Sequence, residues 1–205
     1  KLSRLAFCDE LTGGMNDTSF SMTAQRYMKE QEGQYVLVSM DIQDFKMINQ
    51  VYGTQEGNRT LRYVYQTLRA QLRSDEPMAR NSGDVFFFLL KNRDKMTICT
   101  RLLKIYEAVN KFNQELKEPY YLELYFGIYQ PENGDEPLAD MQEKANIARK
   151  HKKGDDRYRY NFYDEEVQKR NIREKEMMGM VDYSMRNCDF LIYLQPKVQL
   201  ENNRV

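Results

Sequence analysis

Two aspartates are the side chains of this 205-residue sequence best placed to do chemistry. Asp41 closes the apolar stretch 34–42, QYVLVSMDI, which is typical of a buried strand. Asp84 lies in the segment NSGD, whose residue types favour the turn of a β-hairpin. If that hairpin pairs with the first strand, both carboxylates meet at one sheet edge and could hold a hard cation such as Mg²⁺. An Asp at a strand end or in a turn is commonly a cap or turn former, and spacing alone favours that structural role.

The elements that must position these aspartates follow from the spacing of apolar residues. The run VFFFLL at 85–90 has no polar face, so we expect this strand to be covered on both sides. The full order is strand, helix, hairpin, helix, strand, helix, strand, and it predicts an α/β (α+β) domain of ferredoxin-like type, with a central mixed or antiparallel sheet flanked by helices. The expected elements after the first strand are a short helix at 45–49, a helix over 58–73, hairpin strands at 77–80 and 85–90, a helix over 98–116, a strand over 122–128, a helix over 138–152 and an edge strand near 160–162.

Composition excludes several classes of protein. Basic and acidic residues balance at 31 each, so we expect no nucleic-acid partner, and we interpret the basic run at 149–159 as a solvated helix end and loop. No apolar run approaches the roughly 20 residues of a membrane span. Cys8, Cys99 and Cys188 lie far apart and cannot build a zinc site with the lone His151, which favours reduced cysteines and a cytoplasmic location. Because the sequence starts at Lys1, we expect a fragment whose parent could carry upstream sensor or membrane segments.

Five motifs, met in the family's order, are similar to those of GGDEF domains, the diguanylate cyclase family. The resemblance covers about residues 2–164 and implies the nucleotidyl-cyclase version of the ferredoxin-like fold. The matching segments are DELTGGMNDTSF at 9–20, DIQDFKMINQVYGTQEGNRTL at 41–61, ARNSGDVF at 79–86, YFGIY at 125–129 and EKANIARKHKKG at 143–154.

The resemblance implies a chemistry and a set of ligands. Diguanylate cyclases join two GTP molecules, one from each of two facing domains, into cyclic di-GMP by phosphoryl transfer, which depends on positioning and on metal ions. By this resemblance Mg²⁺ would be held by Asp41, by the Ile42 carbonyl and by Asp84. The nucleotide would be held by backbone amides at Phe45 and Lys46, by Asn49 and Asn58 at the guanine edge, and by Lys150 at a phosphate.

Several positions depart from the family pattern, and all of the departures weaken GTP turnover. Val85 stands where the signature has Glu, and losing one such electrostatic contact commonly costs roughly 10²–10³ in rate. Ser82 replaces the first signature Gly and places a Cβ where backbone would approach the ligand. Asn58 replaces an Asp and can accept from guanine through one oxygen only, while Asp155 stands at an expected phosphate-binding Arg. The sequence therefore predicts a degenerate GGDEF domain with no intact catalytic set and, at most, weakly held Mg²⁺.

A second candidate site precedes the hairpin. Arg73 and Glu76 fall where many family members carry an inhibitory R-x-x-D motif, so Arg73 could contact a phosphate or guanine of cyclic di-GMP. The alternative is a solvated helix end, where an Arg also suits the helix dipole.

The end of the sequence suggests a second domain. Segment 190–205 resembles the first strand of an EAL domain, the cyclic-di-GMP phosphodiesterase family, around its Q-P-K motif at Gln195, Pro196 and Lys197. We therefore expect a degenerate GGDEF domain at 1–164, a connecting helix at 165–187 and the truncated start of an EAL domain at 188–205. The phosphodiesterase site would lie outside this sequence, on an EAL domain in cis.

These observations lead to three hypotheses. The first is a regulatory, GTP-sensing or dimerisation domain in a GGDEF–EAL protein of cyclic-di-GMP signalling, without cyclase activity. The second is a slow diguanylate cyclase in which Asp41 and Asp84 suffice. The third is a protein-interaction domain that binds neither GTP nor cyclic di-GMP. The sequence leaves open the input signal, the oligomeric state and the activity of the EAL half.

Overall fold

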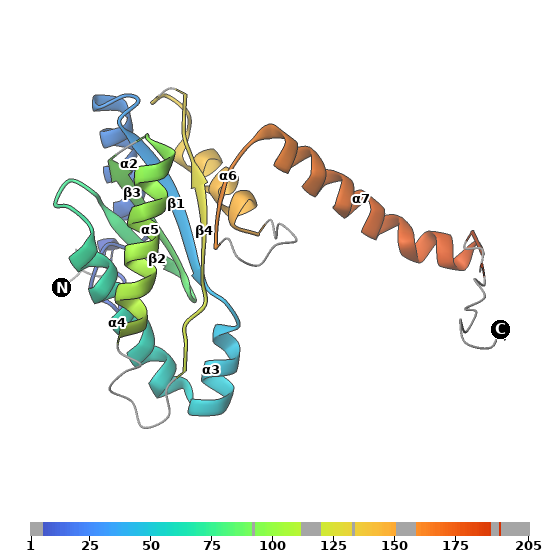
Figure 1. Ribbon diagram of the computed structural model, residues 1–205, viewed down its shortest axis with the longest axis horizontal. Coiled ribbons are helices and arrows are strands. Elements are labelled where there is room, and N and C mark those ends of the chain that lie inside the picture. Colours follow the sequence, from blue (N-terminus) through green and yellow to red (C-terminus); the bar gives the residue numbers. More distant parts are fainter. Residues whose placement is uncertain are drawn as a thin grey trace, which may run out of the picture. The chain divides into compact units, whose positions relative to one another are not determined.

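The computed structural model describes residues 6–91, 93–111, 120–132, 134–150, 159–189 and 193. Its centre is a five-stranded sheet in the order β2-β3-β1-β4-β5 (Figure 1). β1 pairs antiparallel with both β3 and β4, β2 pairs antiparallel with β3, and β5 runs parallel to β4. The predicted mixed sheet is thus confirmed. The strands are β1 (Tyr35–Ile42), β2 (Met78–Ser82), β3 (Val85–Lys91), β4 (Leu124–Tyr129) and β5 (Tyr160–Phe162).

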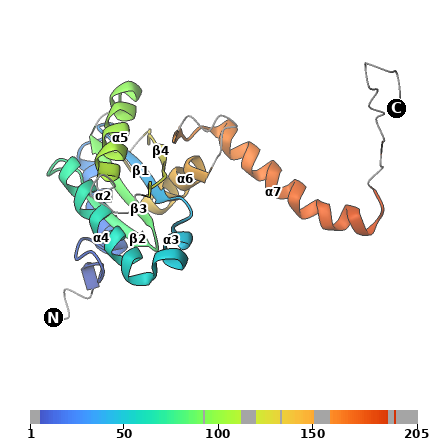
Figure 2. The same ribbon diagram turned by 60° about the horizontal axis from the view of Figure 1, so that its bottom comes forward.

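Helices cover both faces of the sheet. Apolar residues of α4 and α5, which lie side by side in Figure 2, pack with one set of strand residues, and those of α2 and α6 pack with the opposite set. Alternate residues of β3 enter the two clusters, which explains why VFFFLL has no polar face. The helices are α2 (Asp17–Glu30), α3 (Phe45–Tyr52), α4 (Thr54–Gln71), α5 (Lys95–Asn110), α6 (Leu138–Lys150) and α7 (Glu165–Arg186).

Two helices differ from the expectation. Helix α2 was not predicted, although its N-cap residue Asn16 accepts a hydrogen bond from the Ser19 amide at 3.1 Å, as a helix start requires. Helix α4 begins at Thr54 rather than near residue 58, because Gly57 lies inside the helix instead of breaking it. A Cβ at Gly57 would come within 2.0 Å of Asn49 Oδ1, so glycine is what lets α3 and α4 pack closely.

The chain divides into two compact units, residues 1–168 and 169–205. Helix α7 occupies most of the predicted connecting segment, and four of its methionines, Met177, Met178, Met180 and Met185, are exposed. The strand expected over 190–200 lies almost entirely outside the described residues, as do the ends of the helices predicted to reach 116 and 152. None of the helices in the described ranges combines the length and apolar character that a bilayer crossing demands.

Candidate functional site

The carboxyl end of β1 gathers the predicted metal ligands. The antiparallel register of β1 and β3 runs to the pair Met40 and Phe86, and Asp41 and Val85 are the next residues along the two strands. The Asp84 carboxylate accepts hydrogen bonds from the backbone amide of Ile42 and from its own amide, so Asp84 lies beside the last residue of β1. Burial raises the pKa of Asp84, against the opposing effect of these amides. The structure therefore places Asp41, Ile42 and Asp84 together at the carboxyl end of β1, which we call the β1 edge. The apolar Val85 stands there in place of the carboxylate of the family signature.

A buried arginine also reaches this edge. Arg149, in the last turn of α6, forms an ion pair with the carboxylate of Asp41. Its Nε donates to Ser39 Oγ at 2.9 Å, and Ser39 Oγ in turn donates to Asn146 Oδ1 at 2.7 Å. Arg149 is only 7% exposed, and burial lowers its pKa. A guanidinium is a far stronger base than any other side chain, so Arg149 remains a cation at neutral pH and pairs with the Asp41 carboxylate.

Glycine in β4 makes room for this arginine. Gly127 lies opposite Ser39 in the β1–β4 register, directly under α6. A Cβ at Gly127 would come within 2.0 Å of the Ala145 carbonyl oxygen and 2.4 Å of the Arg149 backbone nitrogen. The helix can therefore approach the sheet closely enough for Arg149 to reach Asp41 only because residue 127 has no side chain.

The basic run at 149–159 was expected to be a solvated helix end and loop, but Arg149 is buried, so that interpretation is wrong for this residue. The signal that could have found it is the spacing of the buried α6 residues. Arg149 follows Leu138, Met141 and Ala145 in steps of three, four and four, which puts it on the buried face of the helix. Lys150, the predicted phosphate contact, is exposed, and residues 151–158 lie outside the described part of the chain.

The predicted phosphate contacts lie at the start of α3. Its N-cap residue Asp44 has φ 52°, a left-handed conformation that non-glycine residues adopt infrequently and that is often associated with functional loops. The amides of Phe45 and Lys46 belong to the first helical turn, where backbone donors have no partner within the helix and can bind an anion. Phe45 packs in the core while Lys46 is exposed, so this helix start is firmly anchored yet open to solvent.

The predicted guanine contacts lie on two adjoining helices. Asn49 of α3 touches Gly57, the residue directly before Asn58 in α4. Asn58 is exposed and lines a cavity of about 600 Å³ that also includes Asp9, Arg62 and Arg80. Arg80 Nη1 donates to Asp9 Oδ2 at 2.7 Å. The cavity wall thus ties the hairpin to the segment that precedes α2.

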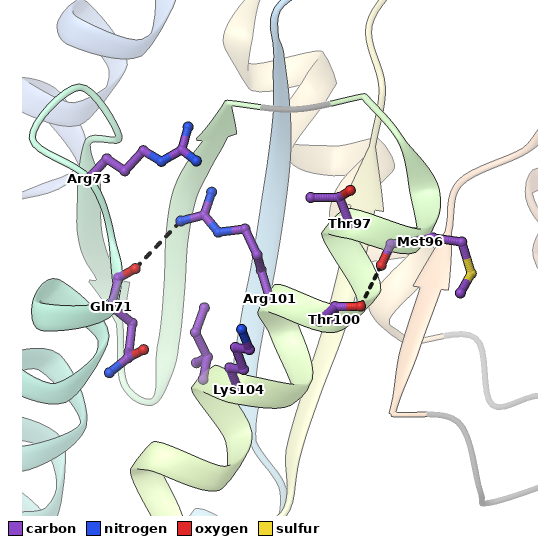
Figure 3. Close-up of a pocket in the computed structure, with 8 residues that line it drawn as sticks. Gln71, Arg73, Met96, Thr97, Thr100, Arg101 and Lys104 are labelled. Atoms are coloured by element: carbon purple, nitrogen blue, oxygen red, sulfur yellow. Dashed lines mark hydrogen bonds between the residues drawn. The ribbon is translucent and has the colours of Figure 1, made fainter.

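The second candidate site is a separate cavity of about 470 Å³ between the end of α4 and α5. In Figure 3 the guanidinium groups of Arg73 and Arg101 reach toward the same space from these two parts of the chain. Glu76, the other half of the predicted motif, is fully buried and forms an ion pair with Arg101. It also accepts hydrogen bonds from the amides of Arg73 and Lys91, each at 2.8 Å. The lining residues are Gln71, Arg73, Met96, Thr97, Thr100, Arg101, Lys104 and Ile105.

The charges around this cavity favour an anionic ligand. Three cationic residues line it, Arg73, Arg101 and Lys104, and the carboxylate of Glu76 neutralises one of them. Burial raises the pKa of Glu76, but the hydrogen bonds from Arg101 and from the two amides outweigh that effect and lower it. The structure therefore places Glu76 inside the protein as the anchor of Arg101, and leaves Arg73 and Lys104 at the cavity.

The residues at the β1 edge do not fit a pair of magnesium ions. Two such ions beside a triphosphate need several carboxylate or carbonyl oxygens. Asp41 is already paired with Arg149, Val85 supplies no oxygen, and Asp84 is the remaining carboxylate of the predicted set. Among the described residues, no group of three or more His, Cys, Asp or Glu side chains could hold a metal ion.

A family model and several curated proteins match this chain. The family model described as "Diguanylate cyclase, GGDEF domain" matches residues 6–159. The bifunctional diguanylate cyclase/cyclic di-GMP phosphodiesterase MucR of Pseudomonas aeruginosa is 22% identical over 206 residues, covering 98% of this chain and 30% of MucR. The cyclic di-GMP phosphodiesterase NbdA of the same bacterium is 24% identical over 217 residues, covering 100% of this chain and 26% of NbdA. The chain thus spans less than a third of the length of these relatives.

Solved structures agree with this fold. A coiled coil and GGDEF domain of DgcB from Caulobacter crescentus, in complex with c-di-GMP, matches with a TM-score of 0.65 at 22% identity, covering 78% of this chain and 87% of that one. The S helix-GGDEF-EAL part of LapD from Vibrio cholerae, bound to c-di-GMP, matches with a TM-score of 0.65 at 16% identity, covering 78% of this chain and 37% of that one.

Proposed function

The chain belongs to the GGDEF family, and we propose that it is a regulatory, GTP-sensing or dimerisation domain of cyclic-di-GMP signalling that does not itself make cyclic di-GMP. The observation that carries this proposal is the ion pair between Arg149 and Asp41. It engages the carboxylate that the family resemblance assigns to the metal, and Val85 adds no replacement oxygen.

The proposal follows from what the reaction demands. Phosphoryl transfer from GTP depends on cations that neutralise the charge developing on the phosphate oxygens. Magnesium would supply that neutralisation if it were bound, but the residues of this edge do not provide its ligands. The helix-start amides at Phe45 and Lys46 do not need a metal to meet a phosphate, so nucleotide binding can persist where turnover is lost.

Two measurements on the purified protein test this function. Incubation with GTP and MgCl₂ is expected to yield no cyclic di-GMP, and calorimetry with GTP is expected to show weak binding that Asn49→Ala reduces. A slow cyclase would instead form product, and loss of that product in Asp41→Ala would establish it. A domain that interacts only with proteins would release no heat even at millimolar GTP.

The cavity beside Arg73 supports a second candidate function, the binding of cyclic di-GMP. Its support is the surplus of positive charge on a cavity of about 470 Å³, together with the presence of c-di-GMP in the similar DgcB and LapD structures. A charge-assisted hydrogen bond to phosphate contributes about 1.5–3 kcal/mol, so Arg73→Ala should weaken binding about tenfold or more. Arg26→Ala, which removes an exposed arginine of α2, is the matched control. Equal affinities for the two variants would count against this site.

The proposed setting is a cytoplasmic GGDEF–EAL protein with the EAL domain in cis. The motif at residues 195–197 and the phosphodiesterase names of MucR and NbdA support this arrangement. Ligand binding could change phosphodiesterase activity only if it favours one of two states of the connection that includes α7. Comparing phosphodiesterase rates of the full-length protein with and without GTP tests that coupling.

A further inference from the structure

We propose that Arg149 is a built-in cation that takes the place of the divalent metal at Asp41, so that this pocket works without a metal ion. The inference rests on the proposed function where it concerns GTP, but its statement about the metal stands alone. The proposal predicts that the natural protein holds no divalent cation at Asp41. It also predicts that removing the Arg149 guanidinium creates a site for such a cation.

The first support is the placement of the guanidinium. Asp41 and Ser39 alternate along β1 on the face that α6 covers, and Arg149 contacts both of them. Its side chain is 6% exposed whereas that of Asp41 is 28% exposed. The cation therefore comes from inside the protein, and the carboxylate is what lies toward solvent. A metal arriving from solvent would meet a carboxylate whose charge is already balanced.

The second support is that the network fixes Arg149 in this position. Ser39 Oγ accepts from Arg149 Nε and donates to Asn146 Oδ1, while Arg149 Nη2 lies 3.4 Å from the same Asn146 oxygen. Ser39 is fully buried, so its hydroxyl has no water to replace these partners. Turning Arg149 away would leave buried polar groups unsatisfied as well as an unpaired carboxylate, and the pair is therefore a lasting feature of the fold.

The third support is the shortage of other ligands. Val85 follows directly on the paired residues of β1 and β3 and supplies no oxygen, and the Asp84 carboxylate already accepts hydrogen bonds from the Ile42 amide and from its own amide. Once Arg149 is removed, however, Asp41, Asp84 and the Ile42 carbonyl would form a small set of oxygens at one edge. Such a set is sufficient for a weak divalent site with a Kd on the order of 1 mM.

Titration of the whole chain with MnCl₂ alone, followed by electron paramagnetic resonance of free Mn²⁺, tests the metal statement. The natural protein should show no binding that depends on Asp41, whereas Arg149→Met should bind Mn²⁺ with a Kd on the order of 1 mM. The double variant Arg149→Met with Asp41→Asn should lose that gain. Arg26→Met makes the same chemical change on an exposed face of α2 and should leave Mn²⁺ binding as it is.

Binding of Mn²⁺ by the natural protein that Asp41→Asn abolishes would overturn the proposal, and so would a folded Arg149→Met that gains nothing. If Arg149→Met fails to fold by circular dichroism, the titration of the natural protein still decides, and Arg149→Gln offers a smaller change. Calorimetry with GTP then distinguishes the proposal about the metal ion from the proposed GTP-sensing role. Equal affinity within about twofold in EDTA and in MgCl₂ supports the metal-independent pocket. No GTP binding in either buffer would refute the GTP-sensing role while leaving the metal result untouched.

Discussion

Replacing Glu76 tests whether this residue serves the fold rather than a ligand. Glu76→Ala removes a fully buried carboxylate that pairs with Arg101 and accepts two backbone amides. Breaking a buried pair by removing one partner costs about 3–5 kcal/mol. The Arg101 side chain is 17% exposed and borders the cavity, so it can turn toward water, and we expect the lower end, about 3 kcal/mol. For a domain of this size that loss lowers Tm by about 6–12 °C.

Thermal unfolding followed by circular dichroism measures this loss, and Asp75→Ala is its control. Asp75 is the neighbouring acid, but its ion pair with Lys91 at 3.0 Å is solvent-exposed, so its loss should cost about 1 kcal/mol at most. Because the pKa of Glu76 is lowered in the folded protein, its contribution is fully present above its ordinary value of 4.5 and is lost as pH falls through the folded pKa. The Tm difference between the natural protein and Glu76→Ala should therefore shrink on acidification below about pH 4.5. A folded Glu76→Ala with an unchanged Tm at pH 7 would refute this structural role.

Three further substitutions test other parts of the structure by the same Tm measurement. Gly127→Ala should destabilise the protein by about 1–3 kcal/mol or more, since its Cβ would press on the α6 backbone, and wild-type stability would contradict that packing. Asp84→Asn should raise Tm at pH 7 and leave it unchanged near pH 3. Because the pKa of Asp84 is raised in the folded protein, its ionised carboxylate destabilises the fold only as pH rises above the ordinary pKa of 3.8. A lower Tm at pH 7 would count against this prediction. Asp94→Ala should cost about 1 kcal/mol, because Asp94 caps α5 by accepting from the Thr97 amide at 2.8 Å, and an unchanged Tm would argue against the cap.

The elements with a strong apolar period could be predicted from the sequence, and those with a weak one could not. The apolar residues of β1 and β3 form long runs, and their pairing follows from the hairpin and the alternation of helices and strands. Helix α2 buries only Phe20, Ala24 and Met28 among fourteen residues, so its period is faint beside its polar positions. Gly57 misled the prediction of α4, because glycine's effect on a helix depends on what packs against it.

Some features of the candidate site could likewise be predicted from the sequence, and others depend on tertiary packing. The strand order places Asp41 and Asp84 at one edge, and the sequence could predict that much from two motifs. The Arg149 pair depends instead on how closely α6 approaches the sheet, which is a property of tertiary packing at Gly127. Glu76 shows the same limit, since no spacing rule distinguishes a carboxylate facing a ligand from one facing Arg101 across 25 residues.

The motifs by which this chain matches its family therefore carry two separable kinds of information. Gly127 is required by backbone packing alone, because a Cβ there would come within 2.0 Å of the Ala145 carbonyl oxygen whatever ligand the pocket holds. Matches at such positions report the fold and are silent about turnover. Positions 41, 85 and 149 instead set the charge that a phosphate or a metal would meet. A match at such a glycine therefore says nothing about the charge at Asp41, which in this chain is paired with Arg149.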